Sequence, residues 1–396
     1  MQLHINASDQ QRALQDAREL DPFRSDLISE IKEHLWCFDY ATTPLYQLKN
    51  LAVHLGIAEI FIKDEGQRSS LRSFKTLGGA HAVIRLVLEV AGKTLGRDVA
   101  ASEIDSPEVR KVASQITITC ATDGNHGRAV ASAATRLGCR SVIYIHKGVS
   151  ERRAAAIRDK GADVIRIDGS YDDSIAFTTA TAKENGWHVV SDTSWPGYEV
   201  IPTWVMQGYL PMADELMQQF SLTGKKATHI FLQAGVGGFA AAVVAHIHSR
   251  LGEHAPKFIV VEPDKAACVF SSSINNRIVR LDESQPTVMG MLECYEPSML
   301  AWSILKKLAT AFITISDDED LHAMARLATP VGSDPSVQGG ESGAAGLAGL
   351  EACVGSESTR ELLGIDEHSV VLLINTEGAT DESLYASLLQ KGRETL

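Results

Sequence analysis

One lysine stands at a position that cations usually avoid. Lys75 follows a short apolar segment, residues 60–63, that is typical of a strand, and it precedes an apolar run, residues 80–90, that is typical of a helix. Because a helix N-terminus carries partial positive charge, a partly desolvated lysine in this connection should give up its proton readily. A neutral lysine amine can attack a carbonyl group and form a Schiff base. A solvated surface lysine is the alternative interpretation, and it is the commoner role of a single lysine.

A second candidate is the loop Thr-Asp-Gly-Asn-His-Gly at residues 122–127, which lies between a strand pattern and a helix pattern. Gly124 and Asn125 leave backbone N–H groups free at a helix N-terminus, which makes a ready anion site. Asp123 adds a carboxylate beside them. An ordinary turn capped by Asp or Asn fits the same residues. We interpret His126 as structural, although histidine is suited to proton transfer.

A third candidate is the loop at residues 233–240, Gln-Ala-Gly-Val-Gly-Gly-Phe-Ala, which again connects a strand to a helix. Its backbone amides predict a phosphate cradle without any basic side chain. The amides belong to Gly235, Val236, Gly237 and Gly238. The loop also fits the dinucleotide fingerprint G-x-G-x-x-A, with Glu262 as the ribose-binding acid, and this predicts an NAD-dependent oxidoreductase. Close packing of strand and helix through glycine is the remaining interpretation.

The fourth candidate is Thr376, which follows the last apolar strand pattern, residues 370–374. In an open α/β sheet, ligands bind at the carboxyl ends of the strands. The hydroxyl of Thr376 is therefore expected to face a ligand.

The elements that must position these residues alternate between strand and helix patterns along the chain. Apolar runs rich in β-branched residues occur at residues 60–63, 116–121, 141–145, 164–167, 189–190, 230–232, 258–261, 313–315 and 370–374. Continuous apolar runs are typical of buried strands in parallel sheets that helices cover on both faces. We therefore predict an α/β fold with twisted, mainly parallel sheets flanked by helices.

The composition narrows the class of protein. The 396 residues carry a formal net charge of −13, which argues against nucleic acid as the partner. The six cysteines have no zinc-site spacing, so no metal is expected. Residues 1–20 do not resemble a signal peptide, and no apolar run reaches transmembrane length. We expect a cytoplasmic protein without a membrane partner that acts on a small molecule.

Taken together, these features resemble the fold-type II pyridoxal-phosphate enzymes of the tryptophan-synthase-β and threonine-dehydratase kind. Within that group the chain is most similar to the diaminopropionate ammonia-lyases, from about residue 43 to residue 382. The matching segments are residues 63–65, 73–75, 77–80, 122–127, 171–173, 192–193, 201–204, 206–209, 233–238, 262–266, 340–343 and 376–378, with Trp195, Gly197 and Tyr198.

The resemblance implies how pyridoxal 5'-phosphate would bind. Lys75 would carry it as a Schiff base, and Asn125 would hold the ring hydroxyl. The backbone of residues 235–238 would bind the phosphate, and Thr376 would face the ring nitrogen. A neutral hydroxyl at that position suits elimination chemistry, because it does not force protonation of the ring.

The resemblance also implies the reaction, which is α,β-elimination of 2,3-diaminopropionate to pyruvate and ammonia in amino-acid degradation. Asp123 and Asp192 would bind the β-ammonium group of the substrate. Lys75 or Asp123 would take the proton from Cα. Thr122 and Gly124 would line the substrate.

The chain departs from the family pattern just before the lysine. The family usually has Phe-Gly-Leu-Gly or a similar sequence there, whereas this chain has Ser-Ser-Leu-Arg at residues 69–72. If the guanidinium of Arg72 meets the substrate, an acidic substrate such as hydroxyaspartate or an N-substituted diaminopropionate becomes the alternative. Dehydration of serine or threonine is another, although Asp123 with Asp192 favours a cationic leaving group. A non-catalytic relative would lack one of these groups, yet all are present.

The resemblance further implies two domains with the cofactor in the cleft between them. The large domain would comprise residues 1–84 and 204–396, and the small inserted domain residues 85–203. A homodimer is expected. Cys268 and Cys294 stand where the family can also have cysteine, so they are expected to lie close together, either as a disulfide or as two reduced thiols.

Overall fold

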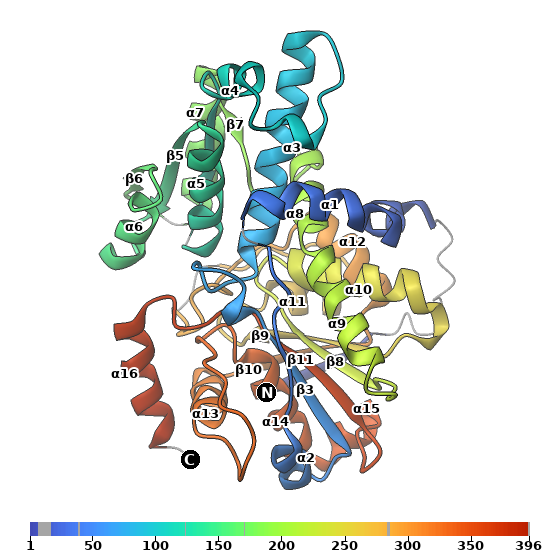
Figure 1. Cartoon of the computed structure of the whole chain (residues 1–396). Coiled ribbons are helices and arrows are strands. Elements are labelled where there is room, and N and C mark those ends of the chain that lie inside the picture. Colours follow the sequence, from blue (N-terminus) through green and yellow to red (C-terminus); the bar gives the residue numbers. More distant parts are fainter. Residues whose placement is uncertain (7–16, 39, 123, 170, 283–285, 395–396) are drawn as a thin grey trace. The chain divides into compact units, whose positions relative to one another are not determined.

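The computed structural model describes residues 1–6, 17–38, 40–122, 124–169, 171–282 and 286–394 (Figure 1). The chain forms two compact units. Unit 1 comprises Met1–Ser25, Ala41–Phe74 and Met212–Leu396, and unit 2 comprises Asp26–Tyr40 and Lys75–Pro211. The predicted domain boundaries after residues 84 and 203 differ from these bounds, and residues 26–40 belong to unit 2. The division into independent domains and the cofactor cleft stay predictions.

Unit 1 contains a seven-stranded sheet with the order β1-β10-β9-β8-β11-β3-β2. The strands are β1 (Gln2–Ile5), β10 (Ala311–Ile315), β9 (Lys257–Pro263), β8 (His229–Gln233), β11 (Val370–Asn375), β3 (Glu59–Asp64) and β2 (Leu45–Gln47). The five central strands are parallel, and only β1 and β2, at the two edges, run antiparallel to their neighbours. The sheet is therefore mixed at its edges and parallel where it is buried.

Helices cover this sheet. They are η2 (Ala17–Phe23), α2 (Lys49–Leu55), η5 (Glu65–Gln67), α9 (Leu210–Ser221), α10 (Gly238–Leu251), η7 (Gly252–His254), α11 (Cys268–Asn275), α12 (Met299–Leu308), α13 (Asp317–Ala328), α14 (Ala345–Val354), α15 (Glu357–Leu363) and α16 (Glu382–Arg393). The apolar side chains of β3, β8, β9, β10 and β11 pack with those of α2, α13 and α14 into one buried cluster. Figure 1 shows β3, β11 and β8 side by side in this layer.

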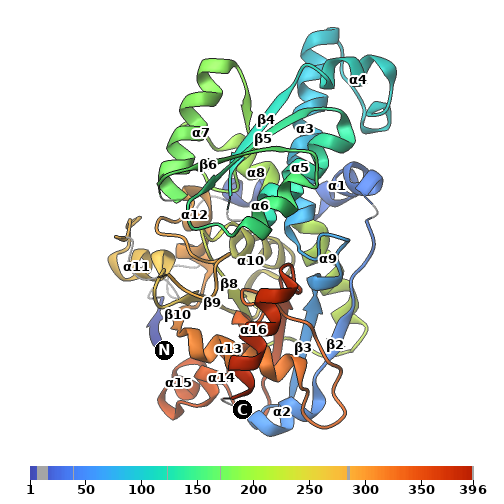
Figure 2. The ribbon, with the colours of Figure 1, turned by 90° about the vertical axis from the view of Figure 1, so that its left-hand side faces the viewer.

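Unit 2 contains a four-stranded parallel sheet with the order β6-β5-β4-β7. Its strands are β4 (Thr117–Ala121), β5 (Arg140–His146), β6 (Asp163–Ile167) and β7 (His188–Val189). Its helices are η3 (Ser25–Leu27), α1 (Ile28–Leu35), η4 (Trp36–Phe38), α3 (Lys75–Leu95), η6 (Ala101–Glu103), α4 (Pro107–Ala113), α5 (Asn125–Leu137), α6 (Glu151–Arg158), α7 (Tyr171–Asn185) and α8 (Val200–Gly208). Helices α5 and α6 lie on one face of the sheet and α7 on the other (Figure 2).

The predicted α/β class is confirmed, and each apolar run predicted as a strand overlaps one, although Ile116 and Val190 lie just outside β4 and β7. The sequence did not indicate β1 or β2. Both are antiparallel edge strands whose side chains are mostly half-buried, so they lack the continuous apolar run of a buried strand. Lys75 was predicted to precede its helix, but it is the first residue of α3. The apolar pattern does not reveal this first turn, because Gly78 and Gly79 occupy it.

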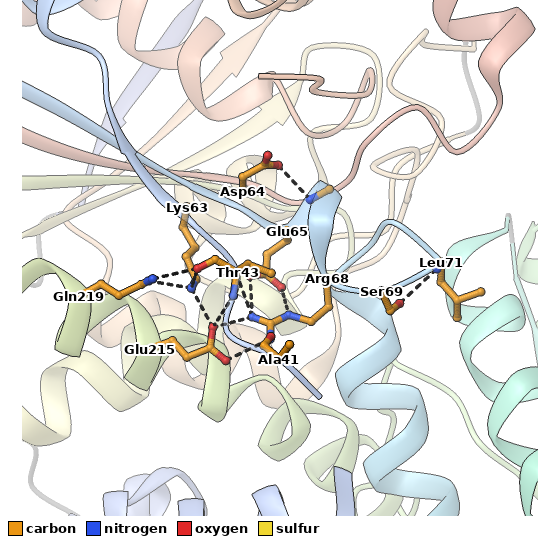
Figure 3. A network of polar contacts seen from close by, with 11 residues as sticks. Ala41, Thr43, Lys63, Asp64, Glu65, Arg68, Ser69, Leu71, Glu215 and Gln219 are labelled. Atoms are coloured by element: carbon orange, nitrogen blue, oxygen red, sulfur yellow. Dashed lines mark hydrogen bonds and ion pairs between the residues drawn. The ribbon is translucent and has the colours of Figure 1, made fainter. Parts of the chain in front are cut away.

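A buried set of charged side chains in unit 1, shown in Figure 3, holds the chain shortly before Lys75. It contains two cations, Lys63 and Arg68, and two carboxylates, Glu65 and Glu215. None of the four side chains is more than 3% exposed. The charges balance, so each buried ion has a partner of opposite sign.

Arg68 is the centre of this network. Its guanidinium donates to Glu65 Oε2 at 2.7 Å and to Glu215 at 2.8 and 3.0 Å. Lys63 Nζ donates to the same Glu215 carboxylate at 2.7 Å and to the carbonyl of Thr43 at 2.7 Å. These bonds join β3, η5 and α9, and they fix the point from which the chain runs to Phe74.

Removing one partner from this network should destabilise the protein strongly. Arg68→Met leaves two buried carboxylates with one remaining cation, and an uncompensated buried charge costs about 3–5 kcal/mol. Urea unfolding should show this loss. The matched control is Lys93→Met, which removes an exposed partner of Glu89 and should cost less than about 0.5 kcal/mol. Equal losses in the two variants would contradict the account.

Candidate active site

The amine of Lys75 forms an ion pair with Oδ2 of Asp192, and both residues belong to unit 2. The two side chains are 19% and 12% exposed, so water screens the pair only weakly. Although burial alone would raise it, the Lys75 ammonium holds the pKa of Asp192 well below its usual range. Asp192 was predicted to bind the substrate, and the structure brings it to the predicted catalytic lysine.

His126 lies next to the same carboxylate oxygen. Its Nδ1 is 4.0 Å from Asp192 Oδ2, and its Nε2 is 2.8 Å from the carbonyl of Val190. Because a carbonyl can only accept, Nε2 carries the proton and Nδ1 presents its lone pair. Burial lowers the pKa of His126, which favours this neutral form. Sequence reasoning treated His126 as structural, and only the distance to Asp192 shows that it belongs to the cluster.

The loop that precedes α5 is organised by Thr122. Its Oγ1 accepts hydrogen bonds from the backbone N–H groups of Gly124 and Gly127, each at 3.0 Å. Asn125 is the first residue of α5 and is 6% exposed. The hydroxyl of Thr122 therefore caps the loop, and its predicted contact with the substrate stays a prediction. Asp123, the predicted second carboxylate, lies outside the residues that the structure describes.

The glycine-rich loop of unit 1 ends at the N-terminus of α10. Gly237 has φ of 91°, a left-handed conformation that favours glycine. Within the described part of the chain, no hydrogen bond occupies the N–H groups of Val236, Gly237 and Gly238. These groups point from the positive end of a helix dipole, which suits an anion.

Gln233, which ends β8 directly before this loop, connects the loop to Thr376. Gln233 Nε2 donates to Thr376 Oγ1 and to the carbonyls of Ser342 and Ile374, each at 3.0 Å. The N–H of Phe74 donates to the carbonyl of Thr376 at 3.1 Å. The residue directly before Lys75 is thus fixed to the strand end that carries Thr376.

Glu262 does not serve as a ribose-binding acid. Its carboxylate is fully buried and accepts the N–H groups of Val269 at 2.8 Å and Phe270 at 2.6 Å, so it caps α11. Burial raises the pKa of this carboxyl to about 8, despite these two donors. An NAD-dependent oxidoreductase would need this carboxylate to bind a ribose, but the carboxylate already accepts the two N–H groups of α11.

Arg72 adopts a left-handed backbone conformation, with φ of 53°, where the family pattern has small residues. Its guanidinium donates to the carbonyl of Ala379 at 3.3 Å and lies 3.5 Å from Glu382 at the start of α16. The side chain is 43% exposed. The Arg72 guanidinium is therefore bonded to Ala379 and paired with Glu382. Its predicted contact with the substrate stays a prediction.

Cys268 and Cys294 both lie beside the glycine-rich loop. The thiol of Cys268 donates to the carbonyl of Gly235 at 3.7 Å, and a Cβ on Gly235 would lie 3.0 Å from Sγ of Cys294. Both side chains are buried, and no disulfide joins them in this structure.

Within the described residues, no helix is long and apolar enough to cross a membrane. The same residues contain no group of three or more His, Cys, Asp and Glu side chains that could hold a metal ion.

Comparison with known proteins connects these features to one family. The model of the pyridoxal-phosphate dependent enzymes matches residues 38–377. Diaminopropionate ammonia-lyase of Escherichia coli K12 is 39% identical over 360 residues, which cover 90% of this chain and 89% of the relative.

Solved structures of that lyase superpose on the whole fold. The selenomethionine holo form from Escherichia coli has a TM-score of 0.88 at 36% identity and covers 99% of this chain and 97% of its own. The complex with an aminoacrylate–pyridoxal-phosphate azomethine intermediate gives the same values. This chain therefore belongs to the pyridoxal-phosphate-dependent enzymes and, within them, to the diaminopropionate ammonia-lyase family.

Proposed function

We propose that the protein catalyses the pyridoxal-phosphate-dependent α,β-elimination of 2,3-diaminopropionate to pyruvate and ammonia. The observation that carries the proposal is the ion pair of Lys75 and Asp192 in a member of this lyase family. This ion pair brings together the amine and the carboxylate that the elimination needs, and both are partly shielded from water.

The residues present fit pyridoxal phosphate. Lys75 offers an amine that can bond to an aldehyde. The N–H groups of Val236, Gly237 and Gly238 fit a phosphate, since they stand at a helix N-terminus without a hydrogen-bond partner in the described part of the chain. Thr376 offers a neutral hydroxyl. The predicted hold of Asn125 on the ring hydroxyl completes the set.

When bound, pyridoxal phosphate supplies an electron sink for the negative charge that develops at Cα of the substrate. The amine of Lys75 or the carboxylate of Asp123 removes the proton from Cα. If Lys75 takes it, the resulting ammonium lies against Asp192, which stabilises that charge. The neutral imidazole of His126 borders the same carboxylate and adds no competing charge.

The leaving group explains why carboxylates are needed. The β-nitrogen departs as neutral ammonia only if it carries a third proton in the substrate. A carboxylate beside it favours that ammonium form, and we assign this role to Asp123 together with Asp192. A charge-assisted hydrogen bond of this kind contributes about 1.5–3 kcal/mol.

The surroundings of the Arg72 side chain help to choose between the candidate substrates. A guanidinium that met the substrate would favour an acidic amino acid. The contacts with Ala379 and Glu382 support a structural role for this side chain instead. We therefore retain unmodified diaminopropionate as the substrate.

A substrate panel tests this choice. Wild type should show its highest kcat/KM, measured as pyruvate release, with diaminopropionate rather than serine, threonine or 3-hydroxyaspartate. Asp123→Asn should lower kcat/KM for diaminopropionate by roughly 10- to 100-fold, the equivalent of one charge-assisted hydrogen bond, and leave cofactor binding intact. Asp163→Asn, at an exposed ion pair of the same unit, should change nothing. A preference for 3-hydroxyaspartate that disappears in Arg72→Gly would overturn the assignment.

A charge placed in the glycine-rich loop tests the phosphate site. Gly237→Asp and Gly237→Ala suffer the same backbone strain, because φ at this residue is 91°. Only Asp adds a negative charge, whose repulsion from a phosphate charge at 4 Å is about 4 kcal/mol at an effective dielectric constant of 20. Equilibrium titration should show at least a ~100-fold weaker affinity for pyridoxal phosphate in the Asp variant than in the Ala variant. Equal affinities would mean that the phosphate binds elsewhere.

We further propose that the enzyme is a homodimer and that it is cytoplasmic, as expected from the sequence. Light scattering coupled to size-exclusion chromatography measures the oligomeric state directly.

A further inference from the structure

Two glycines bring α3 and α8 into direct backbone contact. A Cβ on Gly208 would lie 2.6 Å from Cα of Gly78 and 2.6 Å from the carbonyl oxygen of Leu77. A Cβ on Gly78 would lie 2.7 Å from the carbonyl oxygen of Val205. Since real Cβ atoms do not approach other atoms this closely, neither position accepts a side chain. The helices can therefore meet only where both residues are glycine.

This contact places Tyr209, the residue after Gly208, on the start of α3. A Cβ on Gly78 would lie 2.7 Å from Cζ of the Tyr209 ring, so the ring occupies the space that the glycine leaves. Lys75 stands three residues before Gly78, and residues three apart are neighbours on a helix surface. Burial raises the pKa of the Tyr209 hydroxyl, and the Lys75 amine lowers it through its charge and a hydrogen bond, so the two groups are close enough to interact. Tyr209 is 1% exposed, so no bulk water competes for this amine from that side.

From this geometry we infer that Tyr209 is a further positioning residue, whose hydroxyl orients the amine of Lys75 for its bond with the cofactor. The inference deepens the proposed function and rests on it. The sequence places Tyr209 in a segment that matches the family, residues 206–209, but its distance from Lys75 in the chain hides the contact.

Tyr209 and Asp192 differ in what they can offer the amine. A carboxylate only accepts, so Asp192 holds the charged ammonium form. A neutral hydroxyl can accept an N–H of the neutral amine without favouring the ammonium form, which leaves the lone pair free to attack a carbonyl. Burial raises the pKa of Tyr209 to about 12, and the hydroxyl therefore keeps its proton at neutral pH. The two partners together cover both protonation states of Lys75.

Tyr209→Phe isolates the hydroxyl, because phenylalanine keeps the ring that packs on Gly78. The matched control is Tyr144→Phe in β5 of the same unit, a tyrosine 2% exposed whose ring packs against Phe177. Each variant is freed of cofactor, and the rate of capture of added pyridoxal phosphate by the apo-protein is followed in stopped flow by visible absorbance. The thermal midpoint of each apo-protein is measured alongside.

The capture rate constant should fall about tenfold in Tyr209→Phe, while the thermal midpoint stays within about 2 °C of wild type and Tyr144→Phe behaves as wild type throughout. Capture by Tyr209→Phe at the wild-type rate would overturn the inference. A lower thermal midpoint with a proportionate loss of final affinity would also overturn it, because that result identifies a structural role. Failure of the wild-type apo-protein to bind the cofactor at all would instead overturn the proposed function.

Discussion

The site depends on a partly desolvated ion pair. Lys75 starts a helix, where the dipole disfavours a cation, and Asp192 offsets that cost with a carboxylate from a distant part of the chain. Burial would drive Asp192 towards its neutral form, and the Lys75 ammonium keeps it charged. The pair needs the start of α3 to lie against neighbouring segments of unit 2, and small residues allow this. A Cβ on Gly79 would lie 2.8 Å from the Cβ of Ala129 in α5, so a larger residue at either position would separate the helices.

The glycine-rich loop of unit 1 presents hydrogen-bond donors without a basic side chain. The first turn of α10 leaves N–H groups without partners in the described part of the chain, and Gly237 gives the loop the left-handed turn that exposes them. The chain that leads to Lys75 is anchored at two places in the same unit. Arg68 sits in the buried charge network, and Phe74 is hydrogen-bonded to the strand end at Thr376. The lysine therefore begins from a fixed backbone position.

Much of this could be predicted from the sequence, because buried parallel strands leave continuous apolar runs and anion loops leave glycines. Such local signals singled out Lys75, the glycine-rich loop and Thr376 as candidates. Local signals do not reveal contacts between residues that are far apart in the chain. His126 and Tyr209 belong to the lysine cluster only because the fold brings them there, and Glu262 looked like a ribose acid until its carboxylate was seen to cap α11. The edge strands β1 and β2 lack apolar runs because edge strands are only partly buried.

The central claim is that Lys75 bonds to pyridoxal phosphate. Borohydride reduction of the purified holoenzyme converts that bond into a stable adduct, and peptide mass spectrometry then locates it. We predict the phosphopyridoxyl mass on the peptide that contains Lys75 and on no other lysine. An adduct on a different lysine, or a colourless protein that takes up no adduct, would contradict it.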